Sequence, residues 1–533
     1  MPHGTPLFRD GISKKQNKFS FSAVLSAIVC LCFLAVFCVI NFRGFARFCT
    51  PDMYSDTLLS RIIWESGSIF PENWIFGNQF YVAATPVLAA LMYGLCGSVN
   101  LAMVLATTVM TALTLLSFWW MVRPYADTPR ILLGMAVLLG CVFGPDIVTT
   151  IEGQIFYLMA SYYAGYLITM FVVYGDYTHT LTGRKSGVSL ALAVFLSFCT
   201  GMQSLRQTAV MVLPLLGFEC LRLLYLRFVR KHAESWNWAA TLRAGLYALA
   251  NLAGQVAIKL LDPNCVTMYE DLSFNAPGDL AVRFSTSLRA LRSVTGLKYL
   301  TGETLLLGLA ALVLVLTAVA GLLSLLRRRD RLQGDEILML LLLCSILCIV
   351  CVNMVVNIYI RSIYIFPWYA LAAVAALVLA GKLRKAWQTV LTLVLSAVLL
   401  CNLALSYGPT AANALSDKEP PERQVAQYLM DEGYAFVYGP WVQVSGIAVW
   451  TDGQVAAGSW HENICQVIPY ITPTDIFSQE DNARACYLTT GAGVEQSLQE
   501  YAAAQGASLT LVKRFEGTAY ALYTCDRQLM YFE

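Results

Sequence analysis

Two aspartates near the start of the chain have the residue type and spacing of a catalytic pair. Asp52 and Asp56 lie four positions apart in the segment 51–56, so on a helix both side chains face the same way. One carboxylate could take a proton from an acceptor hydroxyl while the other binds a partner. An aspartate near a helix N-terminus also caps free amides, so the pattern leaves both roles open.

The composition places this pair in a membrane protein. Hydrophobic residues make up 57% of the chain and charged residues 13%, whereas soluble domains have roughly 25% charged residues. The net charge is +2, so the chain lacks the basic face that nucleic acids require. We therefore expect lipid as a main partner and exclude nucleic acid.

The hydrophobic runs predict about eleven transmembrane helices, since about 20 apolar residues cross a bilayer. The first run follows a basic N-terminus, residues 1–20, which we expect in the cytoplasm. The predicted spans are 21–42, 100–121, 131–150, 154–174, 187–201, 206–227, 238–261, 303–325, 336–358, 362–381 and 387–406.

One further apolar stretch, residues 80–96, contains Pro86 and is short for a span. If it crossed the bilayer, every later cluster of Lys and Arg would move to the outer side, against the rule that such clusters stay inside. We therefore predict a juxtamembrane helix on the outer face. The transmembrane domain then covers 21–406, with external loops at 43–99 and 262–302.

A soluble pattern begins near residue 416, where the hydrophobic runs stop. Helical and strand-like segments alternate through 416–533, which predicts a small α/β domain. An odd number of spans places this domain outside the cytoplasm. Its aromatic residues favour core packing over a glycan-binding surface: Tyr438, Trp441, Trp450 and Trp460.

The cysteines and histidines show no metal-binding spacing. Many cysteines lie in apolar runs and behave there as small hydrophobes. Three lie in the C-terminal region, Cys465, Cys486 and Cys525, which leaves room for one disulfide at most. The four histidines are scattered singly, which excludes a His-x-x-x-His site.

The first external loop resembles that of the GT-C glycosyltransferases. The resemblance rests on the order Asp52, Glu65-Ser66-Gly67-Ser68, Pro71 and a helix containing Pro86 that ends near Gly97. This superfamily includes protein O-mannosyltransferases and the aminoarabinose transferases that modify lipid A. Its members place a catalytic Asp early in this loop and use polyprenyl-phosphate sugars, so the resemblance implies that Asp52 is the catalytic base.

Many members have Asp-Glu where this chain has Asp52-Met53. In this chain Asp56 would supply the second carboxylate in place of that Glu, as an assistant or a metal contact. Some relatives use a divalent cation and others none, and the aspartate pair does not decide between them.

Candidate substrate-binding residues lie at the outer ends of predicted spans. A guanidinium of Arg206 or Arg361 could hold a phosphate through paired hydrogen bonds, although interfacial snorkelling is the alternative. Tyr364 belongs to the stretch from Arg361 to Pro367, which looks like the Arg/Tyr-before-Pro segment of many GT-C chains. Glu152 follows the third span and is either a site residue or part of a solvated turn.

The sequence thus predicts a multi-pass enzyme of the cell membrane, with its C-terminal domain extracytoplasmic. It would move a sugar from a polyprenyl-phosphate donor to an envelope glycan, lipid or protein acceptor. The alternatives are a transporter or flippase for lipid-linked saccharides and a non-catalytic scaffold. Transporters place polar residues at the membrane midplane on repeated halves, whereas here the candidate residues gather at one face.

Overall fold

The computed structural model describes residues 20–77, 80–145, 147, 162–230, 237–265, 273–326, 332–357, 360–462, 464–478 and 485–531. The chain packs into two compact units. The first comprises Met1–Cys38, Thr108–Leu261 and Glu270–Ala411. The second comprises Val39–Thr107, Asp262–Tyr269 and Ala412–Glu533.

Eight helices of the described residues are long and apolar enough to cross a membrane. The chain is therefore a polytopic α-helical membrane protein, as predicted, and each of these helices coincides with a predicted span. They are α1 (Phe21–Phe48), α4 (Val99–Val122), the continuous helix Leu205–Phe228, α11 (Trp238–Leu261), Gly302–Leu326 with α13 (Leu305–Leu326), α14 (Gly334–Val355), Ser362–Lys382 with α15 (Pro367–Lys382), and Lys385–Ala414.

The remaining three predicted spans contain helices that are shorter or more polar. These are α5 (Thr128–Gly140), α7 (Tyr162–Leu181) and α8 (Gly187–Gln203). The helix predicted to continue to residue 150 ends at Gly140, and Cys141–Gly144 continue without helical structure although all four are buried. Asn402 Nδ2 donates to the carbonyls of Gly140 (2.8 Å) and Val142 (2.7 Å), as irregular backbone at membrane depth requires.

The helix Leu205–Phe228 is interrupted by π-helical turns. It contains α9 (Leu205–Gln207), η2 (Thr208–Val212), α10 (Leu213–Leu224) and the start of η3 (Tyr225–Arg230). Pro214 lies in the first turn of α10, and a proline removes the amide that would bond four residues back. The wider turn of η2 precedes this proline, and such turns are frequent at functional sites.

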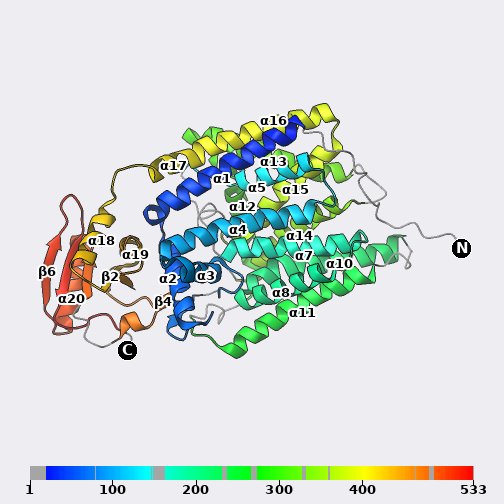
Figure 1. The fold of residues 1–533 in the computed structure, drawn as a ribbon. Helices are drawn as coiled ribbons and strands as arrows, with labels where there is room; N and C mark the ends of the chain where they lie inside the picture. Colours follow the sequence, from blue (N-terminus) through cyan, green and yellow to red (C-terminus); the bar gives the residue numbers. More distant parts are fainter. Residues whose placement is uncertain are drawn as a thin grey trace. The chain divides into compact units, whose positions relative to one another are not determined.

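Helices α8 and α11 run side by side through close backbone contact (Figure 1). A Cβ atom at Gly201 would lie 2.1 Å from the carbonyl oxygen of Asn251. A Cβ atom at Gly254 would lie 2.1 Å from the carbonyl oxygen of Phe198. The two glycines therefore set how closely these helices approach.

The predicted external loop 262–302 contains a helix that the sequence pattern did not reveal. After η5 (Pro277–Asp279) comes α12 (Leu280–Val294), and η6 (Leu297–Tyr299) and η7 (Gly302–Thr304) follow it. Asn353 Nδ2 of α14 donates to the hydroxyl of Ser287 at 2.9 Å. This contact fixes α12 against the end of α14.

The second unit begins with the segment that carries the two aspartates. It contains α2 (Pro51–Ser66), β1 (Trp74–Ile75) and α3 (Thr85–Cys96). At 1.5 Å per residue, α3 is roughly 18 Å long, well short of a hydrocarbon core of about 30 Å. This length agrees with the predicted juxtamembrane helix. Strand β1 pairs antiparallel with β4 (Thr472–Pro473).

The C-terminal region contains a five-stranded sheet in the order β3-β2-β5-β7-β6. Strands β3 (Ala456–Trp460), β2 (Phe436–Pro440) and β5 (Ala485–Thr489) are parallel. Strand β7 (Ala521–Cys525) is antiparallel to both β5 and β6 (Leu509–Arg514). The helices of this region are α18 (Pro421–Asp431), α19 (Trp441–Val449) and α20 (Ala492–Ala504); Figure 1 draws the region in orange and red.

The predicted α/β fold of this region is confirmed, although strands β3 and β4 were not predicted. The predicted helices and strands all occur within a few residues of α18, α19, α20, β2, β5, β6 and β7. Strand β3, with the sequence Ala-Ala-Gly-Ser-Trp, was not predicted, because Gly and Ala are depleted in strands. It forms because β2 offers a parallel partner.

The aromatic side chains of the sheet pack mainly in its core. Tyr438 and Trp460 are 0% and 1% exposed and belong to one hydrophobic cluster, which confirms the core interpretation for these two. All 16 cysteines lie in the described part of the chain and are free thiols, with Cys465 and Cys486 buried. The single disulfide allowed by the sequence therefore does not form.

Candidate active site

The candidate base lies in the first turn of α2. Thr50 is the N-cap, and its hydroxyl accepts a hydrogen bond from the Met53 amide at 3.4 Å. Pro51 follows as the first helical residue, a position where its missing amide has no cost. Thr50 thus does the capping that the sequence also allowed for the aspartates. Asp52 is exposed in the first turn, where the positive end of the helix dipole favours a carboxylate.

Asp56, one turn later, has a different environment. Its side chain is only 2% exposed, whereas Asp52 is exposed. Burial raises the pKa of the neighbouring Cys49 thiol, and the negative charge of Asp56 raises it further. The helix therefore presents one accessible carboxylate and one that is enclosed by protein.

Two contacts within the second unit hold α2 against the C-terminal sheet. The Tyr54 hydroxyl accepts a hydrogen bond from the Ala457 amide of β3 at 2.9 Å. Arg61 Nη1 donates to the Gly453 carbonyl at 2.6 Å. Burial raises the pKa of Tyr54 to about 12, so its hydroxyl remains neutral at physiological pH. The loop with the aspartates and the C-terminal domain thus belong to one compact unit, while the boundary near residue 416 stays a prediction.

In the first unit, two tyrosines from distant segments contact the guanidinium of Arg206. Arg206 Nη1 donates to the Tyr163 hydroxyl at 2.8 Å, and Nη2 donates to the Tyr364 hydroxyl at 3.2 Å. The guanidinium also lies 4.2 Å from the centre of the Tyr364 ring, a distance typical of cation–π contacts. The structure therefore brings together Arg206 and Tyr364, which the sequence named separately.

Arg361 lies near the same group. It is exposed and immediately precedes η8 (Ser362–Ile365), which contains Tyr364. Its charge acts electrostatically on the Tyr163 hydroxyl, as does that of Arg206. Two cationic side chains therefore lie near Tyr163. Arg206 is held by tyrosine hydroxyls, and Arg361 is exposed to solvent.

Tyr163 was not among the predicted site residues. Its only sequence signal is its place among tyrosines within the predicted span 154–174, in Tyr162-Tyr163-Ala164-Gly165-Tyr166. Such aromatics usually indicate interfacial anchoring. Glu152, by contrast, lies outside the described residues, so its predicted role is untested.

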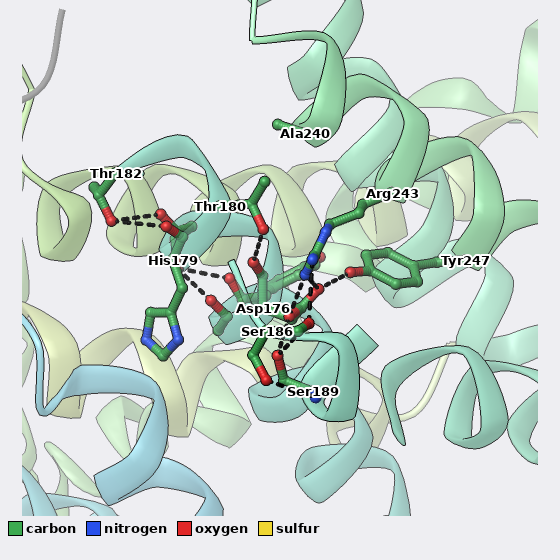
Figure 2. Close-up of polar contacts among 12 residues, drawn as sticks. Asp176, His179, Thr180, Thr182, Ser186, Ser189, Ala240, Arg243 and Tyr247 are labelled. Atoms are coloured by element: carbon green, nitrogen blue, oxygen red, sulfur yellow. Dashed lines mark hydrogen bonds and ion pairs between the residues drawn. The ribbon is translucent and has the colours of Figure 1, made fainter. Parts of the chain in front are cut away.

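Sequence reasoning also missed buried ion pairs inside the helical unit. Figure 2 shows Arg243 and Tyr247, both from α11, pointing toward Asp176 of α7. Arg243 and Tyr247 both bond to the Asp176 carboxylate, and the Ser189 hydroxyl of α8 donates to it as well. Asp176 is 0% exposed, so its charge is compensated entirely by these neighbours.

A second ion pair lies on α10, next to Tyr177 of α7. Arg222 donates two hydrogen bonds of 2.6 Å to the Glu219 carboxylate, and the Tyr177 hydroxyl also donates to it. Buried charges at membrane depth are expensive unless paired. Both clusters join neighbouring helices, which is a structural role.

Within the described ranges, no group of three His, Cys, Asp or Glu side chains could hold a metal ion. The aspartate pair of α2 alone supplies two of the oxygen ligands that a hard divalent cation takes.

Comparison with known proteins supports the fold of the chain. No family model matches the sequence, and no curated protein matches it. Among solved structures, the chain is similar in fold to ArnT, which agrees with the resemblance drawn from the first external loop.

Two similar structures are of ArnT from Cupriavidus metallidurans. The apo structure aligns with a TM-score of 0.54 at 11% identity, over 94% of this chain and 97% of ArnT. The structure of ArnT bound to undecaprenyl phosphate aligns with a TM-score of 0.53 at 10% identity, over 96% and 98%. The similarity therefore extends over nearly all of both chains and shows a common fold.

Proposed function

We propose that this protein is a membrane glycosyltransferase that takes a sugar from a polyprenyl-phosphate donor. The observation that carries the proposal is the fold similarity to ArnT over nearly the whole chain, and the resemblance of the loop that presents Asp52 supports it. One of the similar ArnT structures is bound to undecaprenyl phosphate, which supports a lipid-linked donor.

The arginine group supports the same donor class. A donor phosphate accepts paired hydrogen bonds from a guanidinium, and the tyrosine contacts of Arg206 orient its donor groups before a ligand arrives. Arg361 would then add a second positive charge. Together the two cations would stabilise the negative charge that develops on the leaving phosphate.

The proposed transfer is a single displacement with inversion. Asp52 takes the proton from an acceptor hydroxyl, and that oxygen forms the new bond to the anomeric carbon. The bond between this carbon and the phosphate oxygen breaks, and the electron pair leaves with the polyprenyl phosphate. Asp56, enclosed one turn later, would assist through its fixed neighbours on the same helix. The acceptor is an envelope glycan, lipid or protein on the outer face of the membrane.

The test is mass spectrometry of envelope glycans from cells that lack the protein and are re-supplied with variants at equal membrane abundance. We expect the native chain to restore a glycan and Asp52→Asn to restore less than about 1% of it, since loss of a general base costs 10²–10⁴-fold. Glu65→Gln is the matched control, because Glu65 is an exposed carboxylate on the same helix.

Restoration by Asp52→Asn at the native level would remove Asp52 as the base. Transport or scaffolding would then explain the requirement for the protein, because neither needs a proton acceptor at this position. A glycan restored only by the native chain and Glu65→Gln would identify the product as well as the base.

A further inference from the structure

The C-terminal sheet changes its direction of winding between two neighbouring strands. From β2 the chain passes through α19 to β3 on one side, and from β5 it passes through α20 to β6 on the other. Strand β6 is parallel to β5, because both are antiparallel to β7. In open α/β sheets, ligands bind at such switch points, outside the carboxyl ends of the strands.

A cavity of about 610 Å³ lies at this edge of the sheet. Its wall is formed by residues that follow the parallel strands: Gln443 after β2, Glu462 after β3, and Thr490 with Gly491 after β5. Tyr520, from the turn after β6, completes it. The volume is within the range of about 300–1,000 Å³ that small-molecule sites occupy.

One buried polar atom in this wall points to a ligand. The side-chain oxygen Oε1 of Gln443 is buried and has no hydrogen-bond partner among the described residues. Buried polar groups are almost always paired, and a rotation of this side chain toward the cavity would let a hydroxyl donor there supply the missing partner. This observation is independent of the topology.

The charges of the wall select the kind of ligand. Glu462 contributes a carboxylate, and the residues that line the cavity include no Lys or Arg, so a phosphate or carboxylate ligand would be repelled. The hydroxyls of a sugar can donate to Gln443 and Glu462 and accept from Thr490. Tyr520, whose own hydroxyl donates to Glu422 at 2.7 Å, offers its ring to the C–H face of a sugar.

The backbone leaves this space open. Gly491 has φ +146°, a conformation that side chains rarely adopt, and a Cβ atom at Gly491 or Gly493 would meet nothing within 4 Å. A larger residue at Gly493 would therefore enter the cavity without disturbing the sheet.

We propose that the C-terminal domain binds a neutral saccharide in this cavity, the switch-point cavity. The site belongs to the domain itself, and no step of the proposed transfer uses it. It would give the protein a means to hold a glycan apart from the reacting sugar.

The experiment is saturation-transfer-difference NMR on the full-length protein in lipid nanodiscs. The probes are free glucose, galactose and N-acetylglucosamine, with inorganic phosphate as a competing anion. We expect transfer to at least one sugar with the native protein, and at least tenfold weaker binding with Gln443→Leu and Gly493→Trp. Gln496→Leu is the matched control and should bind as the native protein does, because Gln496 is an exposed glutamine of α20 whose side chain donates to Glu500.

Three outcomes would overturn the proposal: no sugar shows transfer with the native protein, both cavity variants bind as well as the native protein, or phosphate displaces the sugar. The thermal unfolding temperature of Gln443→Leu should equal that of the native protein, because the Oε1 atom it removes has no hydrogen-bond partner among the described residues. Asp52→Asn should leave sugar binding unchanged, so failure of this site and failure of the proposed transfer are separate results.

Discussion

The chemistry proposed for α2 rests on the different burial of two aspartates. Asp52 is accessible at the first turn, and Asp56 is enclosed one turn later. An accessible carboxylate can meet an acceptor hydroxyl, whereas an enclosed one acts on its fixed neighbours. The Tyr54 hydroxyl then connects the same helix to β3, so residues of this turn are sensitive to changes in the C-terminal domain.

The contact of Tyr54 predicts a pH-dependent stability. The pKa of Tyr54 is raised from 10.0 to about 12 in the folded protein, so its contribution is fully present below pH 10 and is lost as pH rises through about 12. We expect Tyr54→Phe to lower the free energy of unfolding at pH 8 by about 1–3 kcal/mol, because the Ala457 amide loses its partner.

Urea unfolding followed by tryptophan fluorescence between pH 8 and pH 12 measures both effects. The difference between native protein and Tyr54→Phe should shrink above pH 10. Tyr93→Phe, on α3 of the same unit, is the control and should keep the native pH profile. A constant difference across this range would show that the Tyr54 hydroxyl does not titrate in this way.

The Arg206 group predicts how donor binding responds to substitution. Arg206→Leu removes the charge and both tyrosine contacts, and we expect at least a tenfold weaker Kd for undecaprenyl phosphate, since hydrogen bonds to charged groups contribute about 1.5–3 kcal/mol. Tyr364→Phe keeps the charge and should weaken binding by less than fivefold. Microscale thermophoresis in detergent measures these affinities. Arg423→Leu, at an exposed arginine, is the control. Equal affinities for Arg206→Leu and the native protein would leave interfacial snorkelling as the role of Arg206.

At the scale of elements, glycine contacts and buried charges determine how the helices of the first unit pack. Gly201 and Gly254 bring α8 and α11 into backbone contact, as small residues do at membrane helix interfaces. The carboxylate of Asp176, on α7, then accepts hydrogen bonds from Arg243 of α11 and Ser189 of α8. Removing one partner from such a buried pair would leave an uncompensated charge.

Two glycines of α11 allow a matched test of this packing. Gly254→Ala places a Cβ atom 2.1 Å from the Phe198 carbonyl, whereas Gly245→Ala meets nothing within 4 Å. We expect Gly254→Ala to destabilise the protein by more than about 2 kcal/mol, in the range of overpacked sites, and Gly245→Ala to be neutral or to stabilise it by about 0.5–1 kcal/mol. Thermal unfolding in detergent distinguishes them; equal Tm values for the two variants would contradict the close approach of α8 and α11.

At the scale of the whole molecule, units are assembled from segments far apart in the sequence. The second unit combines Val39–Thr107 and Asp262–Tyr269 with the C-terminal region. The fold is shared with ArnT at 11% identity, because the lengths and apolar character of the helices determine it more than particular side chains do. The fold is therefore robust, while the chemistry depends on a few residues.

The orientation in the membrane is a prediction at this scale. About eleven crossings from a cytoplasmic N-terminus place the C-terminal domain outside. Alkaline phosphatase, which folds only outside the cytoplasm, should be active when fused after Glu533, and green fluorescent protein should be dark there. Fusions after Gly183, in a predicted cytoplasmic loop, should give the opposite pair of results. An inactive phosphatase and a fluorescent protein fused after Glu533 would show the opposite orientation. The candidate base would then face the cytoplasm.

The sequence by itself determined the elements. Spans such as 238–261 coincide with α11, because the hydrophobic length that crosses lipid is a local property of the chain. The short helix that contains Pro86 and most elements of the C-terminal domain were also predicted from local patterns of apolar and polar residues. Asp52 was singled out from its place after the first span and from the resemblance of its loop.

Only the tertiary structure decided which residues meet. Strand β3 forms through its partner β2, although its own sequence favours no strand. Arg206 meets Tyr163 and Tyr364, which are 43 and 158 positions away, and the enclosure of Asp56 likewise depends on packing. These contacts arise from how helices and strands approach in three dimensions, and local sequence patterns do not encode such distances.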